Sequence, residues 1–198
     1  MSDAHRSAID PRIERSRQVV LKAALEELGA VGYGAFRIES VAARSGVAKS
    51  TIYRHWKDKL ALIGDAFETF HEQQAPDITS GTPRERLERV VRHVAEVAGA
   101  SVFSACIPAL IEGAERDARV RRLHHQFQIE ARRPLVALIA EGVAAGELPA
   151  YVDPEIAASA LLGVVFYRRL MSSEPLDPEQ ADDLVGDLFG PTPPSSTD

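Results

Sequence analysis

The 198-residue sequence is poor in cysteine and in long apolar runs. Its single cysteine, Cys106, excludes an intramolecular disulfide and a metal site built from clustered cysteines. No apolar run reaches the ~18–20 residues that span a bilayer, and residues 1–10 lack the apolar segment of a secretion signal. These absences predict a cytoplasmic protein without a membrane segment.

Lysine is also scarce, and its distribution is uneven. All four lysines lie among residues 1–60, which carry eleven Lys and Arg residues against seven Asp and Glu, a net charge of +4. The rest of the chain carries a net charge of −10. A basic N-terminal part on an acidic remainder indicates a polyanionic partner for the N-terminal part alone, unless the asymmetry is mere compositional drift.

Signals for helices recur along the chain, whereas signals for strands are nearly absent. Asp-Pro pairs stand at 10–11, 153–154 and 177–178, where Asp is a good N-cap and Pro suits the first helical position. Apolar residues keep helical spacing between such marks, so we expect an all-α fold. Pro108 either starts a helix or kinks one. The predicted helices span about 11–31, 38–45, 49–56, a segment after Asp58, 83–100, 105–115, 117–145, 154–172 and 178–189.

Two of these helices, 38–45 and 49–56, flank Gly46 and are too short to be stable alone. Val41 and Ile52 would face inward, and Gly46 permits a left-handed turn that sets the two helices roughly perpendicular. This arrangement is typical of a helix-turn-helix, whose second helix enters the major groove of DNA. A structural helical hairpin with a polar outer face is the alternative.

The N-terminal part of the chain, which contains this motif, resembles the TetR family of transcriptional regulators. The resemblance spans residues 12–65 and rests on LGAVGY at 28–33, VAARSGVAKSTIYRHW at 41–56 and KLAL at 59–62. A weaker one, at 112–117, 142–148, 152–155 and 166–177, is to the ligand-binding and dimerisation region of one TetR subfamily. The resemblance implies a homodimeric, ligand-responsive regulator, usually a repressor, without a cofactor.

The same resemblance, with the polar segment at 73–81, indicates how the chain is divided. We expect a flexible arm at 1–10, a three-helix helix-turn-helix DNA-binding domain with its connecting helix at 11–74, and a disordered tail at 191–198. Residues 82–190 would form a helical bundle for ligand binding and dimerisation. The expected partners are a double-stranded DNA operator with an inverted repeat, a second copy of the chain and a small-molecule effector.

The candidate DNA-binding residues lie mainly on the second helix of the motif. Arg54 can donate hydrogen bonds to O6 and N7 of one guanine. The resemblance implies that Tyr53 and Lys59 contact phosphates. The chain departs from the family at Phe36-Arg37, Ala48 and Leu60; Arg37 can replace a missing hydroxyl contact. We expect Trp56 to close the core. The candidates are Arg37, Lys49, Ser50, Thr51, Tyr53, Arg54, His55 and Lys59.

The segment from 156 to 167 is apolar nearly all round, so it must be covered on both sides. With the helix near 178–189, it suits a dimer interface built as a four-helix bundle, or else the central core helix of a monomer. The candidate interface residues are Ile156, Leu161, Val165, Leu184 and Leu188.

Candidate effector contacts lie on the middle helices, and their character indicates a largely apolar ligand. They are Phe103, Cys106, Leu110, Phe127, Ile139 and Tyr167. We expect no metal site, because the adjacent His124 and His125 diverge by about 100° on a helix. No catalytic motif supports an enzyme. The alternative is a DNA-binding protein of this fold without a small effector, regulated by a protein or acting architecturally.

Overall fold

The computed structural model describes residues 11–74 and 76–191, and over these residues the chain folds into α-helices with no strand. The all-α prediction is therefore confirmed. The expected arm at 1–10 and most of the expected tail lie outside the described residues. The helices are α1 (Pro11–Ala35), α2 (Ile38–Ser45), α3 (Lys49–His55), α4 (Lys59–Gln74), α5 (Pro83–Ala100), α6 (Val102–Arg116), α7 (Ala118–Ala144), α8 (Pro154–Leu170) and α9 (Pro178–Phe189).

Helices α8 and α9 begin at the Asp-Pro pairs that the sequence indicates. Thr82 and Glu85 form the capping box of α5, Asp153 caps α8, and Asp177 caps α9. Two boundaries differ from the prediction. The first helix continues to Ala35 across a kink at Gly32, where φ is +75°, and α6 begins at Val102 behind a Ser101 cap. Pro108 therefore lies inside α6.

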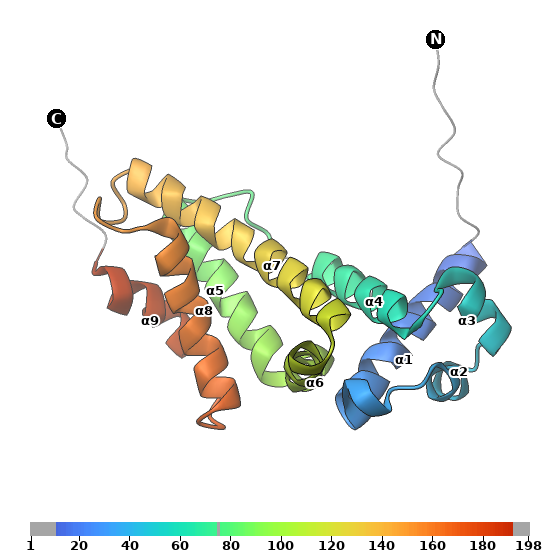
Figure 1. Ribbon diagram of the computed structural model, residues 1–198. Helices are drawn as coiled ribbons and strands as arrows, with labels where there is room; N and C mark the ends of the chain where they lie inside the picture. Colours follow the sequence, from blue (N-terminus) through green and yellow to red (C-terminus); the bar gives the residue numbers. More distant parts are fainter. Residues whose placement is uncertain (1–10, 75, 192–198) are drawn as a thin grey trace, which may run out of the picture.

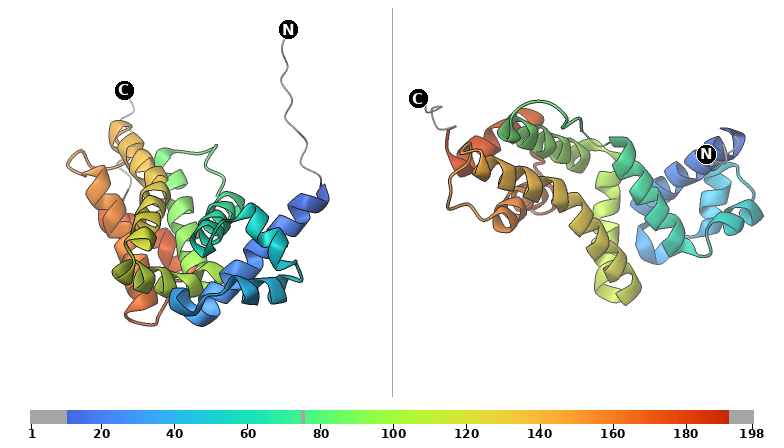
Figure 2. Two further views of the ribbon diagram at one scale, coloured as in Figure 1. Left: turned by 45° about the vertical axis from the view of Figure 1, so that its right-hand side comes forward. Right: turned by 90° about the horizontal axis from the view of Figure 1, so that it is seen from above.

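The helices form two parts, shown in Figures 1 and 2: α1–α4, here called the head, and α5–α9, called the body. Each part has a buried core, but the head core extends into the body. Cys106 and Leu110 of α6, and Val120 of α7, belong to the head core. The body core is built from α5, α7, α8 and α9. Helix α6 therefore joins the two parts.

The contact between α1 and α6 is close. A Cβ on Gly29 would lie only 2.8 Å from the Cβ of Ala105, so glycine is what lets the two helices approach. One residue on, Cys106 Sγ donates a hydrogen bond to the carbonyl oxygen of Leu25 at 3.2 Å. These contacts hold the first helix of the head against the body.

Helix α4 is the helix of the head that faces α7 of the body (Figure 1). Asp58 caps it, accepting from the amide of Ala61 at 2.9 Å, and pairs with Arg119 of α7 at 2.6 Å. Its inner face carries Leu62, Ile63 and Phe67, all at most 1% exposed. No single helix among the described residues is long and apolar enough to cross a membrane; only the pair α5 and α6, bent by 80°, passes by length and composition.

Candidate nucleic-acid interface and ligand cavity

The turn between α2 and α3 has the geometry that the sequence indicates. Gly46 adopts φ +69° and ψ 9°, and its amide donates to the carbonyl oxygen of Ala42 at 3.0 Å. Val41 on α2 and Ile52 on α3 are both fully buried in the head core. Because Ile52 points inward, the opposite face of α3 is turned to solvent.

That outer face carries the residues predicted to contact DNA. Lys49, Ser50, Tyr53, Arg54 and His55 are exposed, and Thr51 is half-buried. The guanidinium of Arg54 donates to the hydroxyl of Thr51 at 3.2 Å, and Lys49 lies 5.6 Å from the centre of the Tyr53 ring. Sequence and structure thus place five donors and one aromatic ring on one exposed helical face.

The two remaining candidates lie off this face. Lys59, at the start of α4, donates to the carbonyl oxygen of Tyr33 at 2.9 Å and lies 4.0 Å from the centre of its ring. Burial lowers the pKa of Lys59, with the charge of Arg37 adding to the effect. Arg37 is exposed and donates to the carbonyl oxygens of Gly34 and Phe36. Both cations are held by backbone oxygens near the end of α1.

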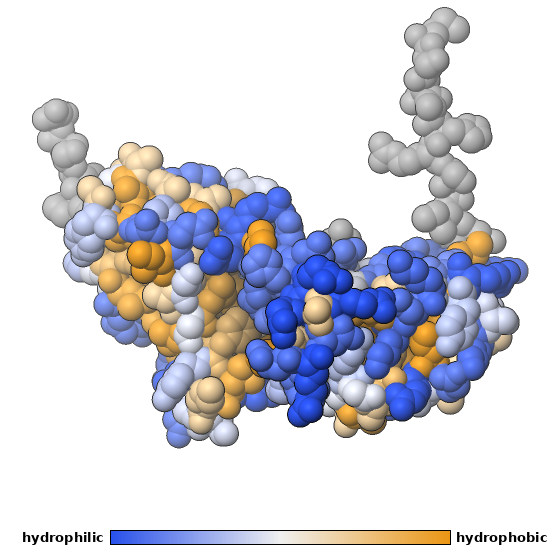
Figure 3. All heavy atoms as spheres, in the orientation of Figure 1, coloured by the Kyte–Doolittle hydropathy of each residue, from blue (hydrophilic) through white to orange (hydrophobic). Residues whose placement is uncertain are grey.

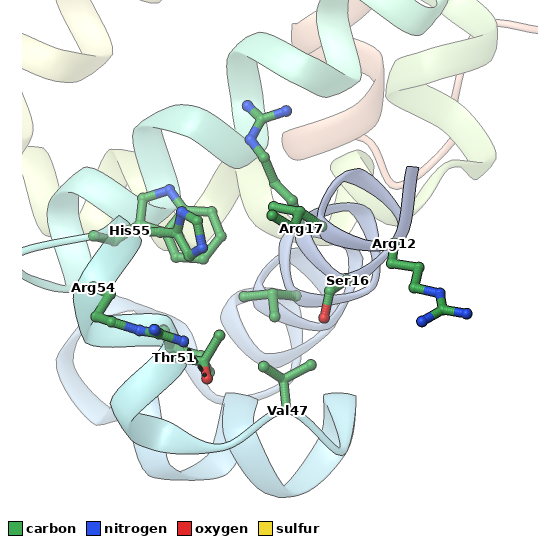
Figure 4. A pocket seen from close by; sticks show the side chains of 11 residues that line it. Arg12, Ser16, Arg17, Val47, Thr51, Arg54 and His55 are labelled. Atoms are coloured by element: carbon green, nitrogen blue, oxygen red, sulfur yellow. Dashed lines mark hydrogen bonds between the residues drawn. The ribbon is translucent and has the colours of Figure 1, made fainter. Parts of the chain in front are cut away.

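A groove of about 380 Å³ adjoins α3, between that helix and the start of α1. Figure 4 shows Ser16 of α1 facing Val47 and Thr51, with Arg54 on one side and Arg12 directed outward on the other. Hydroxyl, imidazole and guanidinium donors of this kind suit the oxygens of a sugar–phosphate backbone. Sequence analysis missed Ser16, because nothing in the helical pattern shows that the first turns of α1 lie beside α3.

Glu39 on α2 is an exposed carboxylate that pairs with Lys49, the first residue of α3. The hydrogen bond from Lys49 lowers the pKa of Glu39, so Glu39 stays ionised at neutral pH. Glu39 therefore holds Lys49, one of the predicted DNA contacts, and places a negative charge beside it.

We expect Glu39→Gln to raise affinity for duplex DNA about fivefold at 0.1 M salt and to steepen the salt dependence by about one ion contact. Fluorescence anisotropy over a range of salt concentrations measures both. Glu68→Gln removes the same charge from an exposed position on α4 and serves as the control. Equal gains in the two variants would show that only net charge had changed.

A second cavity, of about 190 Å³, lies where the head core meets the body core. Its walls come from α4, α5, α6, α7 and α8 and from the segment before α5. The apolar lining residues are Phe67, Phe70, Pro76, Ile78, Val90, Val94, Val97, Ala98, Phe103, Ile107, Phe127, Ala131, Pro134, Leu162 and Phe166. The polar ones are His71, His93, Gln128 and Glu130.

Two of the six predicted ligand contacts, Phe103 and Phe127, line this cavity. The other four lie elsewhere. Cys106 and Leu110 pack in the head core, Ile139 is fully buried in the body core, and Tyr167 is 65% exposed on α8. Burial raises the pKa of the Cys106 thiol to about 12, so this residue is an unreactive packing group.

Two of the phenylalanine rings that line the cavity, Phe67 and Phe70, lie on α4. The Phe70 ring stacks on Phe103 at 5.2 Å, and Phe67 meets Phe103 and Phe127 at 4.8 and 5.1 Å. The polar side includes His93, whose pKa is lowered by burial, so this imidazole is neutral at pH 7. The cavity thus offers aromatic rings and a neutral hydrogen-bonding group. Among the described residues, no group of three His, Cys, Asp or Glu could hold a metal ion.

Helix α8 carries an exposed apolar stripe on the face turned away from the body core. Ile156, Tyr167 and Met171, just past the helix end, are 71%, 65% and 74% exposed, and the small residues Ala160 and Gly163 lie between them. Figure 3 shows hydrophobic surface over this part of the body. Of the predicted interface residues, Ile156 and Leu188 are exposed, whereas Leu161, Val165 and Leu184 are buried within the protomer.

A glycine-centred turn between two short helices, with a donor-rich second helix exposed, defines a helix-turn-helix DNA-binding protein. The chain matches the family model "Bacterial regulatory proteins, tetR family" over residues 20–66. It matches "Tetracyclin repressor-like, C-terminal domain" over residues 76–188. The protein belongs to the TetR family of transcriptional regulators.

Three similar proteins illustrate the match. The HTH-type transcriptional regulator YdeS of Bacillus subtilis is 28% identical over 182 residues, which cover 90% of each chain. FadR of Bacillus subtilis, solved with stearoyl-CoA, is 22% identical, covers 86% of this chain and 95% of its own, and has a TM-score of 0.70. AibR, solved with isovaleryl coenzyme A and operator DNA, is 24% identical, with 89% and 99% covered and a TM-score of 0.66.

Proposed function

We propose that the protein is a repressor that binds an inverted-repeat operator as a homodimer and is released by a small, largely apolar ligand. It would act in the cytoplasm, where bacterial DNA lies. The observation that carries the ligand response is the position of the 190 Å³ cavity. Its walls belong to both cores, and the head core also contains Ile52 of α3, so filling the cavity can alter how the recognition helix is held.

The proposed dimer is supported by the stripe on α8. Exposure of the apolar side chains in this stripe to water is unfavourable. The two small residues between them would let a second copy of the same helix pack closely. A symmetric dimer supplies two copies of α3, which would contact half-sites about one DNA turn, or a multiple of it, apart. An inverted-repeat operator follows from that symmetry.

The proposed ligand is apolar because five phenylalanine rings and many aliphatic side chains line the cavity. FadR and AibR were solved with acyl-CoA molecules, so acyl-CoAs of several chain lengths are the first compounds to test. Fatty acids and uncharged aromatic compounds form the second group. The neutral His93 supplies one hydrogen bond to a polar group on any of them.

The experiment begins with duplexes selected from a random library by the full-length protein. An inverted repeat among them is the expected result; half-sites without symmetry would contradict dimeric binding. Compounds that raise the melting temperature are then titrated against the protein–duplex complex. A true effector weakens DNA binding by about 5–150-fold, and DNA must weaken the effector by the same factor. If no compound class does this, the regulator of the same fold without a small effector becomes the better proposal.

A further inference from the structure

The recognition helix ends at Trp56, which is tied to α4. Trp56 is the C-cap of α3, its amide donates to the carbonyl oxygen of Ile52 at 2.9 Å, and its side chain is buried. The indole Nε1 donates to Oδ2 of Asp65 at 2.7 Å. A hydrogen bond from a packed ring to a carboxylate is both directional and stronger than a neutral one. The end of α3 is therefore fixed to the middle of α4.

The second oxygen of Asp65 is also engaged. Oδ1 accepts a hydrogen bond from Arg17 of α1, and the same guanidinium lies 3.3 Å from the hydroxyl of Thr69. Asp65 thus joins α1, α3 and α4 through one carboxylate. Its two partners differ in stiffness, because the Arg17 side chain has several rotatable bonds and can follow a moving carboxylate, whereas the buried indole cannot move without its helix.

The same helix forms a wall of the ligand cavity. Phe67 stands two residues after Asp65, and Phe70 one turn further on, and both rings pack on Phe103 at the cavity. Phe67 is only 1% exposed, so a molecule that presses on its ring also presses on α4. Helix α1 is held against α6 by the close approach of Gly29 to Ala105, so it provides a fixed frame against which α4 moves.

We infer that Asp65 is the positioning residue that couples the cavity to the recognition helix: it converts a displacement of α4 into a displacement of Trp56 and hence of α3. The inference rests on the proposed ligand response. A second link, between Asp58 and Arg119, joins α4 to the body and does not reach α3. Among the hydrogen bonds and ion pairs of the described residues, the Asp65–Trp56 hydrogen bond joins α4, two residues before the cavity-lining Phe67, to the end of α3.

The test replaces the unidentified ligand with a substitution. Val97→Phe adds a ring within the cavity, and Trp56, the sole tryptophan, reports on its own surroundings by fluorescence. With Asp65 present, Val97→Phe is expected to weaken binding to the selected duplex about tenfold and to shift the Trp56 emission. With Asp65→Ala, the same substitution should weaken binding less than about threefold and leave the emission where it was.

Three further variants make the result specific. Asp65→Asn keeps an acceptor for the indole and should restore part of the tenfold effect. Trp56→Phe removes the donor and keeps the Arg17–Asp65 contact, so Val97→Phe should weaken its DNA binding as little as in Asp65→Ala, even if that variant folds poorly. Because Trp56→Phe also removes the only tryptophan, DNA affinity is its readout. Asp182→Ala breaks an Arg–Asp pair between α5 and α9, away from the cavity, and should retain the full effect. Thermal unfolding of every variant measures whether the substitution lowers the stability of the folded protein.

The outcomes separate this inference from the proposed function. An equal effect of Val97→Phe with and without Asp65 would overturn the coupling and leave the ligand response standing. No effect of Val97→Phe on affinity or emission in the otherwise unchanged chain would count against both. A tenfold effect that depends on Asp65 and Trp56 and survives Asp182→Ala establishes Asp65 as the coupling residue.

Discussion

Replacement of Gly163 by arginine is expected to separate the proposed dimer into monomers and to lower affinity for the selected duplex by about 10²–10⁴-fold. Gly163 is exposed at the centre of the stripe on α8, and a Cβ built there meets nothing within 4 Å in the protomer. The protomer therefore tolerates the arginine. The facing helix of a second copy would not, because a guanidinium would be buried there without a partner.

Sedimentation velocity at micromolar concentration measures the assembly, and anisotropy measures DNA binding. Ala137→Arg, at an exposed position of α7, introduces the same side chain on another helix and should leave both unchanged. A Gly163→Arg protein that remains dimeric would place the interface elsewhere. Leu161→Glu and Val165→Glu are unsuitable tests, since both residues are buried in the body core and a carboxylate there would unfold the protomer.

The contrast between Gly163 and Leu161 shows why the sequence located the helix but not its interface. Helix α8 is apolar nearly all round between residues 156 and 167, so periodicity cannot distinguish the face packed on the protomer from the face left for a partner. The two faces differ only in tertiary contacts: α5 and α7 pack against α8 and leave Ile156 and Tyr167 exposed. By contrast, helix starts such as Asp153 and Asp177 follow from local hydrogen bonds and were predictable.

The residues that line the cavity were only partly predictable, because a helical pattern does not show which helices pack together. Phe103 and Phe127 are aromatic residues on the expected helices, but so are residues that pack elsewhere. Cys106 and Leu110 contact α1 because α6 is shared between the two cores, an arrangement that no single helix pattern encodes. His93 carried no sequence signal, since its place at the cavity depends on five helices that converge there. The exposed face of α3 was easier to predict, because Gly46 and Ile52 together fix which side of that helix is buried.

Arg54 on that outer face is the residue expected to contribute most to base preference. Arg54→Ala should lower affinity for the preferred duplex by about 1–3 kcal/mol and relax the preference at one base pair, since a guanidinium can donate two hydrogen bonds to guanine. In the free protein the guanidinium donates to Thr51, one turn earlier, which holds it along the exposed face. Tyr53→Phe removes only a hydroxyl, so it should weaken binding to all duplexes alike, by about 0.5–1.5 kcal/mol.

Arg54→Lys separates charge from geometry. Lysine keeps the positive charge but lacks the planar fork, so this variant should retain the salt dependence of the wild-type protein and lose the base preference. Anisotropy titrations against the preferred duplex and against its single-base-pair variants measure affinity and preference together. If Arg54→Ala left the order of preference intact, base recognition would have to be assigned to Lys49, Ser50 and His55, and Arg54 would be restricted to phosphate contacts.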